Sequence, residues 1–141
     1  MAHDPFDLQR FVTAQDPVWE DVLDELRAGR KRTHWMWFVF PQLAALGRSS
    51  IARHYGLSGL EEAKAYLAHP VLGARLVECC QVLLQLQDDD PVAIFGPVDA
   101  MKLRSCLTLF AEAAPAEAVF RQGLAKYYGG SPDPLTAAAL R

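Results

Sequence analysis

Prolines punctuate this chain, and most of them stand where an α-helix can begin. A proline at the first position of a helix loses only an N–H group that would have no partner there anyway. Asp4-Pro5 and Asp16-Pro17 also place a carboxylate directly before the proline, where it can cap the helix and lies near the positive end of the helix dipole. This punctuation predicts a series of short helices.

Apolar side chains recur at helical spacing in the segments between the prolines. One pattern with Leu8 and Phe11, and a second that starts at Trp19 and stops at Gly29, predict two N-terminal helices. Ser58-Gly59-Leu60-Glu61 has the form of a capping box, which marks the start of another helix. The further helices that we expect cover residues 58–68, 71–87, 97–114 and 115–128, with a short helix or a frayed end at 134–140.

Residues 36–40 differ from these patterns because all five are apolar, so periodicity does not distinguish a strand from a short buried helix. With this segment left open as either extended or helical, the patterns predict an all-α fold in a single compact multihelical domain of residues 1–141. We place its core at about residues 6–128 and a C-terminal tail at residues 129–141. A chain of 141 residues that is 51% hydrophobic can bury one core without metal or disulfide support.

Composition and charge disfavour several classes of protein. A net charge of −3 and a pI near 5.7 are unlike those of a general nucleic-acid binder, which needs a basic face. No apolar run reaches the roughly 18 to 20 residues that span a bilayer, and the acidic N-terminus is unlike a secretory signal. Three cysteines, two of them adjacent, fit reduced and buried thiols. We therefore expect a cytoplasmic protein without a membrane span.

The most distinctive stretch is residues 34–42, HWMWFVFPQ, in which four aromatic residues stand between a histidine and an amide. Aromatic surface beside unopposed positive charge suits a pocket for an anionic, ring-bearing ligand. Equally, the tryptophans could fill the core; if the segment were extended, Trp35 and Trp37 would share one face. The surrounding residues 26–60 contain no Asp or Glu and six basic residues, Arg27, Arg30, Lys31, Arg32, Arg48 and Arg53.

The familiar catalytic and phosphate-binding motifs are absent from the sequence. It has no Gly-x-x-x-x-Gly-Lys-Ser/Thr loop, no Gly-x-Gly-x-x-Gly and no Gly-x-Ser-x-Gly. The histidines form no helical pair, and the triple aspartate of residues 88–90 favours a turn, so we assign no metal and no cofactor. His34 is the candidate catalytic residue, with a structural histidine as the plainer interpretation.

A polar row borders the apolar face of the helix that we expect at residues 97–114. Asp99, Lys102 and Ser105 recur at every third position along it. The simplest interpretation is an ion pair between residues three apart, which contributes only a few tenths of a kcal/mol. The functional interpretation is an anion clamp of Lys102 and Ser105 opposite the aromatic stretch.

Several motifs are similar to those of a known family. They are His34-Trp-Met-Trp-Phe-x-Phe-Pro-Gln42, Leu46-Gly47-x-Ser49, Ala65-Tyr66-Leu67-x-His69-Pro70-x-Leu72-Gly73-x-Arg75-Leu76, Ile94-Phe95-Gly96-x-x-Asp99-x-x-Lys102-Leu103-x-Ser105 and Thr108-Leu109-Phe110. Over nearly its whole length, from about Phe6 to Leu140, the chain resembles the bacterial family catalogued as domain of unknown function 1810. Some similar proteins bear a calpastatin label, which does not fit a chain that predicts a packed domain, because calpastatin is disordered.

The resemblance implies a small, mostly helical, cytosolic protein without an established activity. Cys106 stands where we expect a second serine in similar sequences, which weakens the case for a paired-hydroxyl site. The resemblance implies that the following polar residues belong to the family pattern: His34, Gln42, Ser49, His69, Arg75, Asp99, Lys102 and Ser105. Combined with the aromatic stretch, it yields these ligand-binding candidates: His34, Trp35, Trp37, Gln42, Arg75, Asp99, Lys102 and Ser105.

Three functional hypotheses remain open from the sequence. The first is a pocket for an anionic small molecule such as a nucleotide or an ADP-ribose derivative, and it requires the candidate side chains to converge. The second is a non-enzymatic protein-interaction module with the aromatics in the core, which requires an exposed apolar or basic patch. The third and weakest is RNA binding by the basic stretch. The sequence does not decide whether the protein catalyses a reaction, and it does not decide the oligomeric state.

Overall fold

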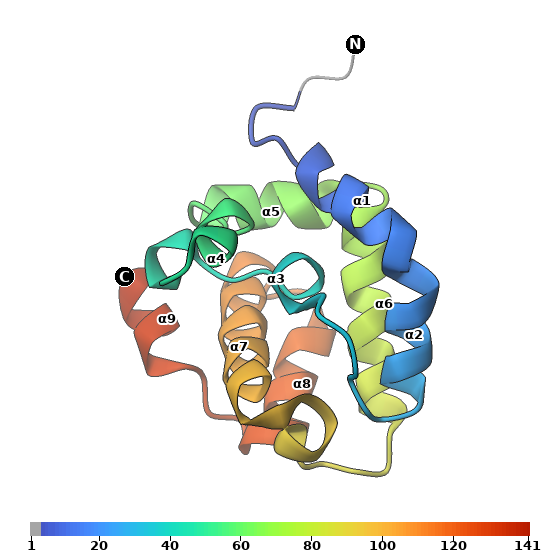
Figure 1. Cartoon of the computed structure of the whole chain (residues 1–141). Coiled ribbons are helices and arrows are strands. Elements are labelled where there is room, and N and C mark those ends of the chain that lie inside the picture. Colours follow the sequence, from blue (N-terminus) through green and yellow to red (C-terminus); the bar gives the residue numbers. More distant parts are fainter. Residues whose placement is uncertain (1–3) are drawn as a thin grey trace.

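The structure is a computed structural model that describes residues 4–141, and all of its regular elements are helical (Figure 1). In the described residues the only β-type pairing is an isolated bridge between Leu43 and Leu57. This confirms the predicted all-α class and the single compact domain. The α-helices are α1 (Gln9–Gln15), α2 (Trp19–Arg27), α3 (Met36–Val39), α4 (Ser50–His54), α5 (Leu60–Ala68), α6 (Leu72–Gln85), α7 (Pro91–Ala113), α8 (Ala118–Tyr128) and α9 (Pro134–Ala139), with 3-10 turns η1 (Asp16–Val18) and η2 (Ala44–Leu46).

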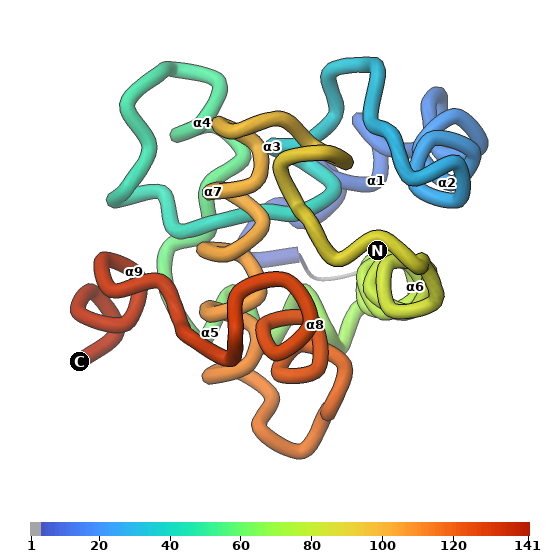
Figure 2. The backbone as a smooth tube through the Cα atoms, turned by 90° about the horizontal axis from the view of Figure 1, so that it is seen from below, coloured from blue at the N-terminus to red at the C-terminus, as the bar shows by residue number. Residues whose placement is uncertain are grey.

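Helix α7 runs through the middle of the molecule, with α2 and α9 on opposite sides of it (Figures 1 and 2). It packs against α5, α8 and α9, and its inward residues Leu103, Cys106 and Phe110 are fully buried. An apolar helix that is covered on several sides becomes the centre of a helical domain. The α7 residues Val98, Met101, Lys102 and Ser105 line a groove together with residues of α9 and of the turn after α3.

The start of α7 differs from the prediction of a turn before Pro97. The helix already begins at Pro91, where the Asp90 carboxylate accepts a hydrogen bond from the Val92 N–H (2.9 Å). It then breaks at Gly96, whose φ of 81° is a conformation that favours glycine. The last residue of the triple aspartate therefore caps α7, and the kink at Gly96 separates two helical segments.

The open question about residues 36–40 resolves as a helix, because α3 forms one turn at Met36–Val39. The extended alternative is therefore wrong, and Trp35 and Trp37 do not share a face. Trp35 is buried, whereas Trp37 is half-buried at the edge of the core. A helical turn of four apolar residues satisfies its backbone locally while it sends side chains in several directions, which a strand does not do.

Other helix ends shift by a few residues from their predicted positions. Helix α8 starts at Ala118, three residues after Pro115, because the Glu117 side chain caps it. Helix α5 is preceded by Ser58, whose backbone N–H and hydroxyl both donate to Glu62 and not to Glu61. The predicted stop after α8 is confirmed at Gly129, which is left-handed (φ 62°).

The C-terminal residues 129–141 include α9, which packs against α7 and has Thr136 buried. The division of the chain into a core and a tail stays a prediction. In the described range 4–141, no single helix is long and apolar enough to cross a membrane; α5 and α6 reach that length and composition only as a pair, across a bend of 89°.

Candidate functional site

Glu25 organises the loop that leads from α2 to the aromatic stretch. Its buried carboxylate accepts hydrogen bonds from the backbone N–H groups of Arg32 (2.5 Å) and Thr33 (2.8 Å), from the Thr33 hydroxyl (2.6 Å) and from the Trp35 indole (3.2 Å). Burial by itself would raise the pKa of Glu25, but these four hydrogen bonds outweigh it and hold the pKa below its ordinary value. The ionised carboxylate thus fixes the position of Trp35 and of the loop before it.

The same loop delivers Lys31 to α7. The backbone N–H of Lys31 donates to the Ile94 carbonyl (2.8 Å), and its ammonium group lies 2.8 Å from Asp99 Oδ2 and 5.0 Å from the centre of the Trp35 ring. Only 6% of the Lys31 side chain is exposed. A lysine so well covered requires a counterion, and Asp99 provides it.

Asp99 also holds a second lysine, because its other oxygen, Oδ1, lies 3.3 Å from Lys102 Nζ. The ammonium group of Lys102 stands over the Trp37 ring, 4.7 Å from its centre. One carboxylate therefore separates two lysines, each of which faces a tryptophan. Lys102 is the more accessible of the two lysines, with 22% of its side chain exposed. Its distance to the Asp99 carboxylate is also longer than that of Lys31.

Gln42 is brought to this cluster by the chain reversal around the isolated bridge. The carbonyl of Gln42 accepts from the Leu57 N–H (2.7 Å), and the Ala44 N–H donates to the Leu57 carbonyl (2.8 Å). Gly56 permits this contact, since a Cβ atom there would lie 2.3 Å from Ala44 Cα. The close approach of the two segments places the Gln42 side chain beside Trp37, where both line a small cavity of about 20 Å³.

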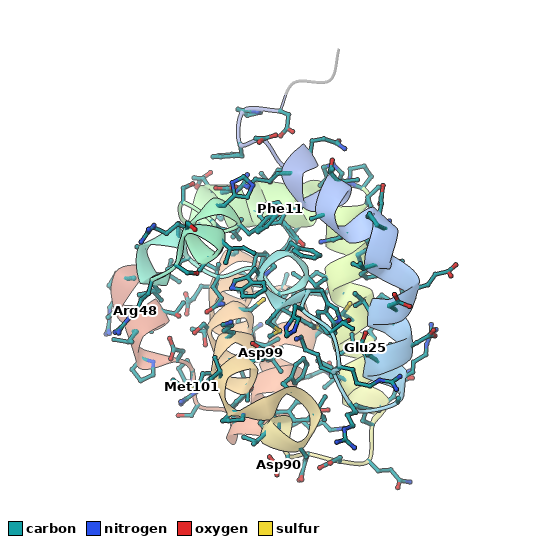
Figure 3. All side chains as sticks on the ribbon, in the orientation of Figure 1. Phe11, Glu25, Arg48, Asp90, Asp99 and Met101 are labelled. Atoms are coloured by element: carbon teal, nitrogen blue, oxygen red, sulfur yellow. The ribbon has the colours of Figure 1, made fainter. Side chains whose placement is uncertain are left out.

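A larger groove of about 220 Å³ opens next to that cavity, between the turn after α3, helix α7 and helix α9. We call it the α7–α9 groove. Figure 3 shows Met101 projecting from α7 on the side of α9. The residues that line the groove are Gln42, Leu46, Val98, Met101, Lys102, Ser105, Asp133 and Leu135.

Five of the predicted site residues come together at or beside this groove. They belong to the aromatic stretch and to the polar row on α7, which are about sixty residues apart in the sequence, and their neighbourhood depends on the packing of α3 against the core. Ser105 is buried, and its hydroxyl donates to the Met101 carbonyl (3.3 Å). The five residues are Trp37, Gln42, Asp99, Lys102 and Ser105.

The remaining three predicted residues lie elsewhere. Trp35 belongs to the core and is bonded to Glu25, and His34 is exposed on the loop before α3. Arg75 stands on α6, where it contacts Gln15 (3.3 Å), pairs with Asp16 (2.9 Å) and covers the Trp19 ring. The structure therefore does not bring Arg75 to the other candidates.

Some residues of the cluster were not identified from the sequence. Lys31 stood in the basic stretch, but nothing in the pattern distinguished it from its neighbours Arg30 and Arg32. Glu25 is the one acidic residue on the buried face of α2, and that position was the available signal of its role. Leu135 has no signal, because its place at the groove depends on how α9 folds back on α7.

The cysteines take no part in the groove. All three are free and buried, and burial raises the pKa of each thiol, that of Cys80 to about 12. Within residues 4–141, no group of three or more His, Cys, Asp or Glu residues is arranged to hold a metal ion. The chemistry available at the groove is thus that of one accessible ammonium group, one carboxylate (Asp133), an amide, a hydroxyl and an apolar wall.

The fold and the groove together define a small helical domain with a mixed polar and apolar surface site. Residues 5–140 match the model of a family described as "Protein of unknown function (DUF1810)", and the chain belongs to that family, as its motifs predicted. It is similar to a crystal structure of the conserved hypothetical protein Rv1873 from Mycobacterium tuberculosis: the sequences are 58% identical, the match covers 97% of this chain and 98% of that one, and the TM-score is 0.95. No curated protein matches the chain.

Proposed function

We propose that the α7–α9 groove binds an anionic small molecule. The observation that carries this proposal is the convergence of two distant parts of the sequence. Gln42 lines the groove with Lys102 and Ser105 of α7, and Trp37 lies beside it, under the Lys102 ammonium group and next to Gln42 in the small cavity. A ligand site typically combines an apolar wall with a few polar groups that fix the orientation of the ligand, and this groove has both. Nucleotides and ADP-ribose derivatives are among the anions to be tested.

Lys102 is the residue that we assign to the anionic group of the ligand. Its ammonium group is held between Asp99 and the face of the Trp37 ring, so it is already oriented before any ligand arrives. A cation whose position is fixed in advance loses little conformational entropy on binding. The amide of Gln42 lines the same groove and adds a neutral hydrogen-bonding group.

The groups at the groove favour binding over catalysis. The Ser105 hydroxyl donates to the Met101 carbonyl, which is not a base that could activate it as a nucleophile. His34 is exposed and precedes α3 by two residues, and it does not line the groove. We therefore assign no reaction to the site.

The proposal is tested by a thermal-shift screen against nucleotides, ADP-ribose, sugar phosphates and organic carboxylates. A ligand at about 100 times its dissociation constant adds roughly 2.7 kcal/mol, which raises the Tm by about 8 °C for a chain of this size. Lys102→Met should abolish the shift while it keeps the aliphatic part of the side chain. Lys64→Met is the matched control, since Lys64 lies on exposed α5 surface with one weak partner, Glu61 at 3.5 Å.

Two outcomes would refute the proposal. One is the absence of any ligand that shifts the Tm of the parent protein across the whole panel. The other is a set of hits whose shifts are the same in Lys102→Met as in the parent, because the anion would then contact a different part of the molecule.

A second candidate function is a protein-interaction module, and one observation favours it. Val98, Met101 and Leu135 are 65%, 72% and 68% exposed, and all three line the same groove. Large apolar side chains gathered on a surface are typical of interfaces. A globular protein partner would bury far more than the groove, so charge substitutions on neighbouring surface would also weaken its binding.

We further propose a cytoplasmic location. The buried free thiols of Cys79, Cys80 and Cys106 support it, because reduced cysteines are usual in that compartment. Fractionation of cells that express the protein at its natural level would test it.

A further inference from the structure

We propose that the ligand of the α7–α9 groove is a small amphipathic monoanion, in which one carboxylate is attached to an apolar chain, and not a di- or triphosphate. This inference rests on the proposed function and narrows its ligand class. It depends on the charges around Lys102, on the apolar wall of the groove and on the size of the groove.

Lys102 offers an anion one accessible positive charge, and the two lysines and two carboxylates at and beside the groove sum to zero. Lys31 and Lys102 share the single carboxylate of Asp99, so the cluster carries one surplus positive charge. Asp133 lines the groove as well, and its carboxylate accepts hydrogen bonds from the N–H and the hydroxyl of Thr136 at the start of α9. A ligand with several phosphate charges would meet two carboxylates and one accessible cation, which disfavours it electrostatically.

The apolar part of the ligand has a continuous surface to lie on. Val98, Met101, Lys102 and Ser105 follow the i, i+3, i+4, i+7 spacing, so they stand on one face of α7. Leu135 borders this face from α9 and Leu46 from η2. Contact with an apolar chain would cover side chains that are otherwise exposed to water, which is the main source of affinity for such a ligand.

The order of residues along α7 also orients the ligand. Lys102 stands over Trp37, which lines the small cavity together with Gln42, whereas Met101 and Val98 precede Lys102 along α7 in the direction of the kink at Gly96. The carboxylate therefore lies at Lys102 and Gln42, and the chain extends over Met101. A volume of about 220 Å³ is below the roughly 300–1,000 Å³ of sites for larger ligands, so it accommodates a short acyl chain and not a whole nucleotide.

The test uses four probes of defined charge, added to the full chain and followed by NMR through the Met101 methyl and the Trp37 indole signals. Octanoate has one negative charge, octyl phosphate has about two at pH 7.5, octanol has none, and ADP has a diphosphate without an alkyl chain. We expect octanoate to shift both signals saturably and to bind at least about 10-fold more tightly than the other three, a difference of about 1.4 kcal/mol. All alkyl probes are used below their micelle concentrations.

Two variants connect the binding to the groove. Lys102→Met should weaken octanoate at least about 10-fold and leave octanol unchanged, because only the charged headgroup loses its partner. Lys64→Met should bind octanoate as the parent does. Both variants lie on the surface of helices, so unchanged circular dichroism and Tm verify that they fold.

Each contrary result has a distinct meaning. If ADP binds more tightly than octanoate and depends on Lys102, the inference is wrong and the proposed function stands. Equal binding of octanol and octanoate would also overturn it, since the groove would then recognise only apolar surface. Signals that shift with protein concentration when no probe is present would also overturn it, because a second copy of the chain would then be the occupant of the groove. No binding of any anion would overturn both the inference and the proposed function.

Discussion

Replacement of Glu25 by alanine should destabilise the protein strongly although the residue is not part of the hydrophobic core. The change removes one carboxylate that accepts four hydrogen bonds, of which the one from the Trp35 indole is fully buried. A buried donor left without a partner costs about 1–3 kcal/mol, and hydrogen bonds to a charged group contribute about 1.5–3 kcal/mol each. The N–H groups of Arg32 and Thr33 can recover part of this from water, because both residues are exposed.

The expected loss for Glu25→Ala is therefore about 3 kcal/mol, or a fall of about 10 °C in Tm. Urea unfolding followed by circular dichroism measures the first quantity and calorimetry the second. Asp24→Ala is the matched control: Asp24 is the exposed neighbour on the same helix, and its loss should change stability by less than about 0.5 kcal/mol. A loss below about 1 kcal/mol for Glu25→Ala would refute the assigned role of the carboxylate.

Acid titration tests the same contact independently. Since the folded pKa of Glu25 lies below its ordinary value of 4.5, the unfolded chain takes up the proton first as the pH falls. The stability that Glu25 contributes is thus fully present above about pH 4.5 and is lost as the pH falls through the lowered folded value. Glu25→Gln should be less stable than the parent at pH 7. Because glutamine does not titrate, this variant should also lose less stability than the parent between about pH 5 and pH 3. Identical acid dependence in both proteins would contradict this reasoning.

Three further predictions concern positions outside the groove. Gly73→Ala should destabilise the protein by about 1–3 kcal/mol in urea unfolding, because its Cβ would lie 2.0 Å from the Leu67 carbonyl oxygen, whereas Gly59→Ala, with nothing within 4 Å, should be tolerated. His69→Ala should lower stability by about 1 kcal/mol, since His69 Nδ1 accepts hydrogen bonds from the N–H groups of Val71 and Leu72 at the start of α6; an unchanged Tm would contradict this. The buried thiols should react with a disulfide reagent at pH 8 only at the rate of unfolding, because burial raises their pKa, that of Cys80 to about 12; fast reaction of the native protein would count against it.

The helices were largely predictable, because capping residues and apolar spacing act over a few neighbouring positions. Gly129 illustrates this, as it directly follows the end of the helix predicted at residues 115–128. The errors arose where a more distant contact decided the outcome. Helix α3 is one such case, since an all-apolar run has no local signal and its conformation follows from the packing around Trp35.

The site was predictable in part for the same reason. Lys102 and Asp99 are three residues apart on one helix, a spacing that predicts their ion pair. Their encounter with Trp37 depends on how the loop after α2 returns to α7, which no local pattern describes. Arg75 shows the opposite error: it belongs to the same motif set as the groove residues, yet its partners are on α1 and η1.

The shared carboxylate of Asp99 makes the loop before α3 a natural reporter of the groove. When an anion draws Lys102 toward itself, Asp99 is left to Lys31 alone, and their attraction is no longer divided. The Lys31 amide, which is bonded to the Ile94 carbonyl, should then open less often. Hydrogen exchange at a single backbone amide, outside the groove itself, would thus register the arrival of a ligand.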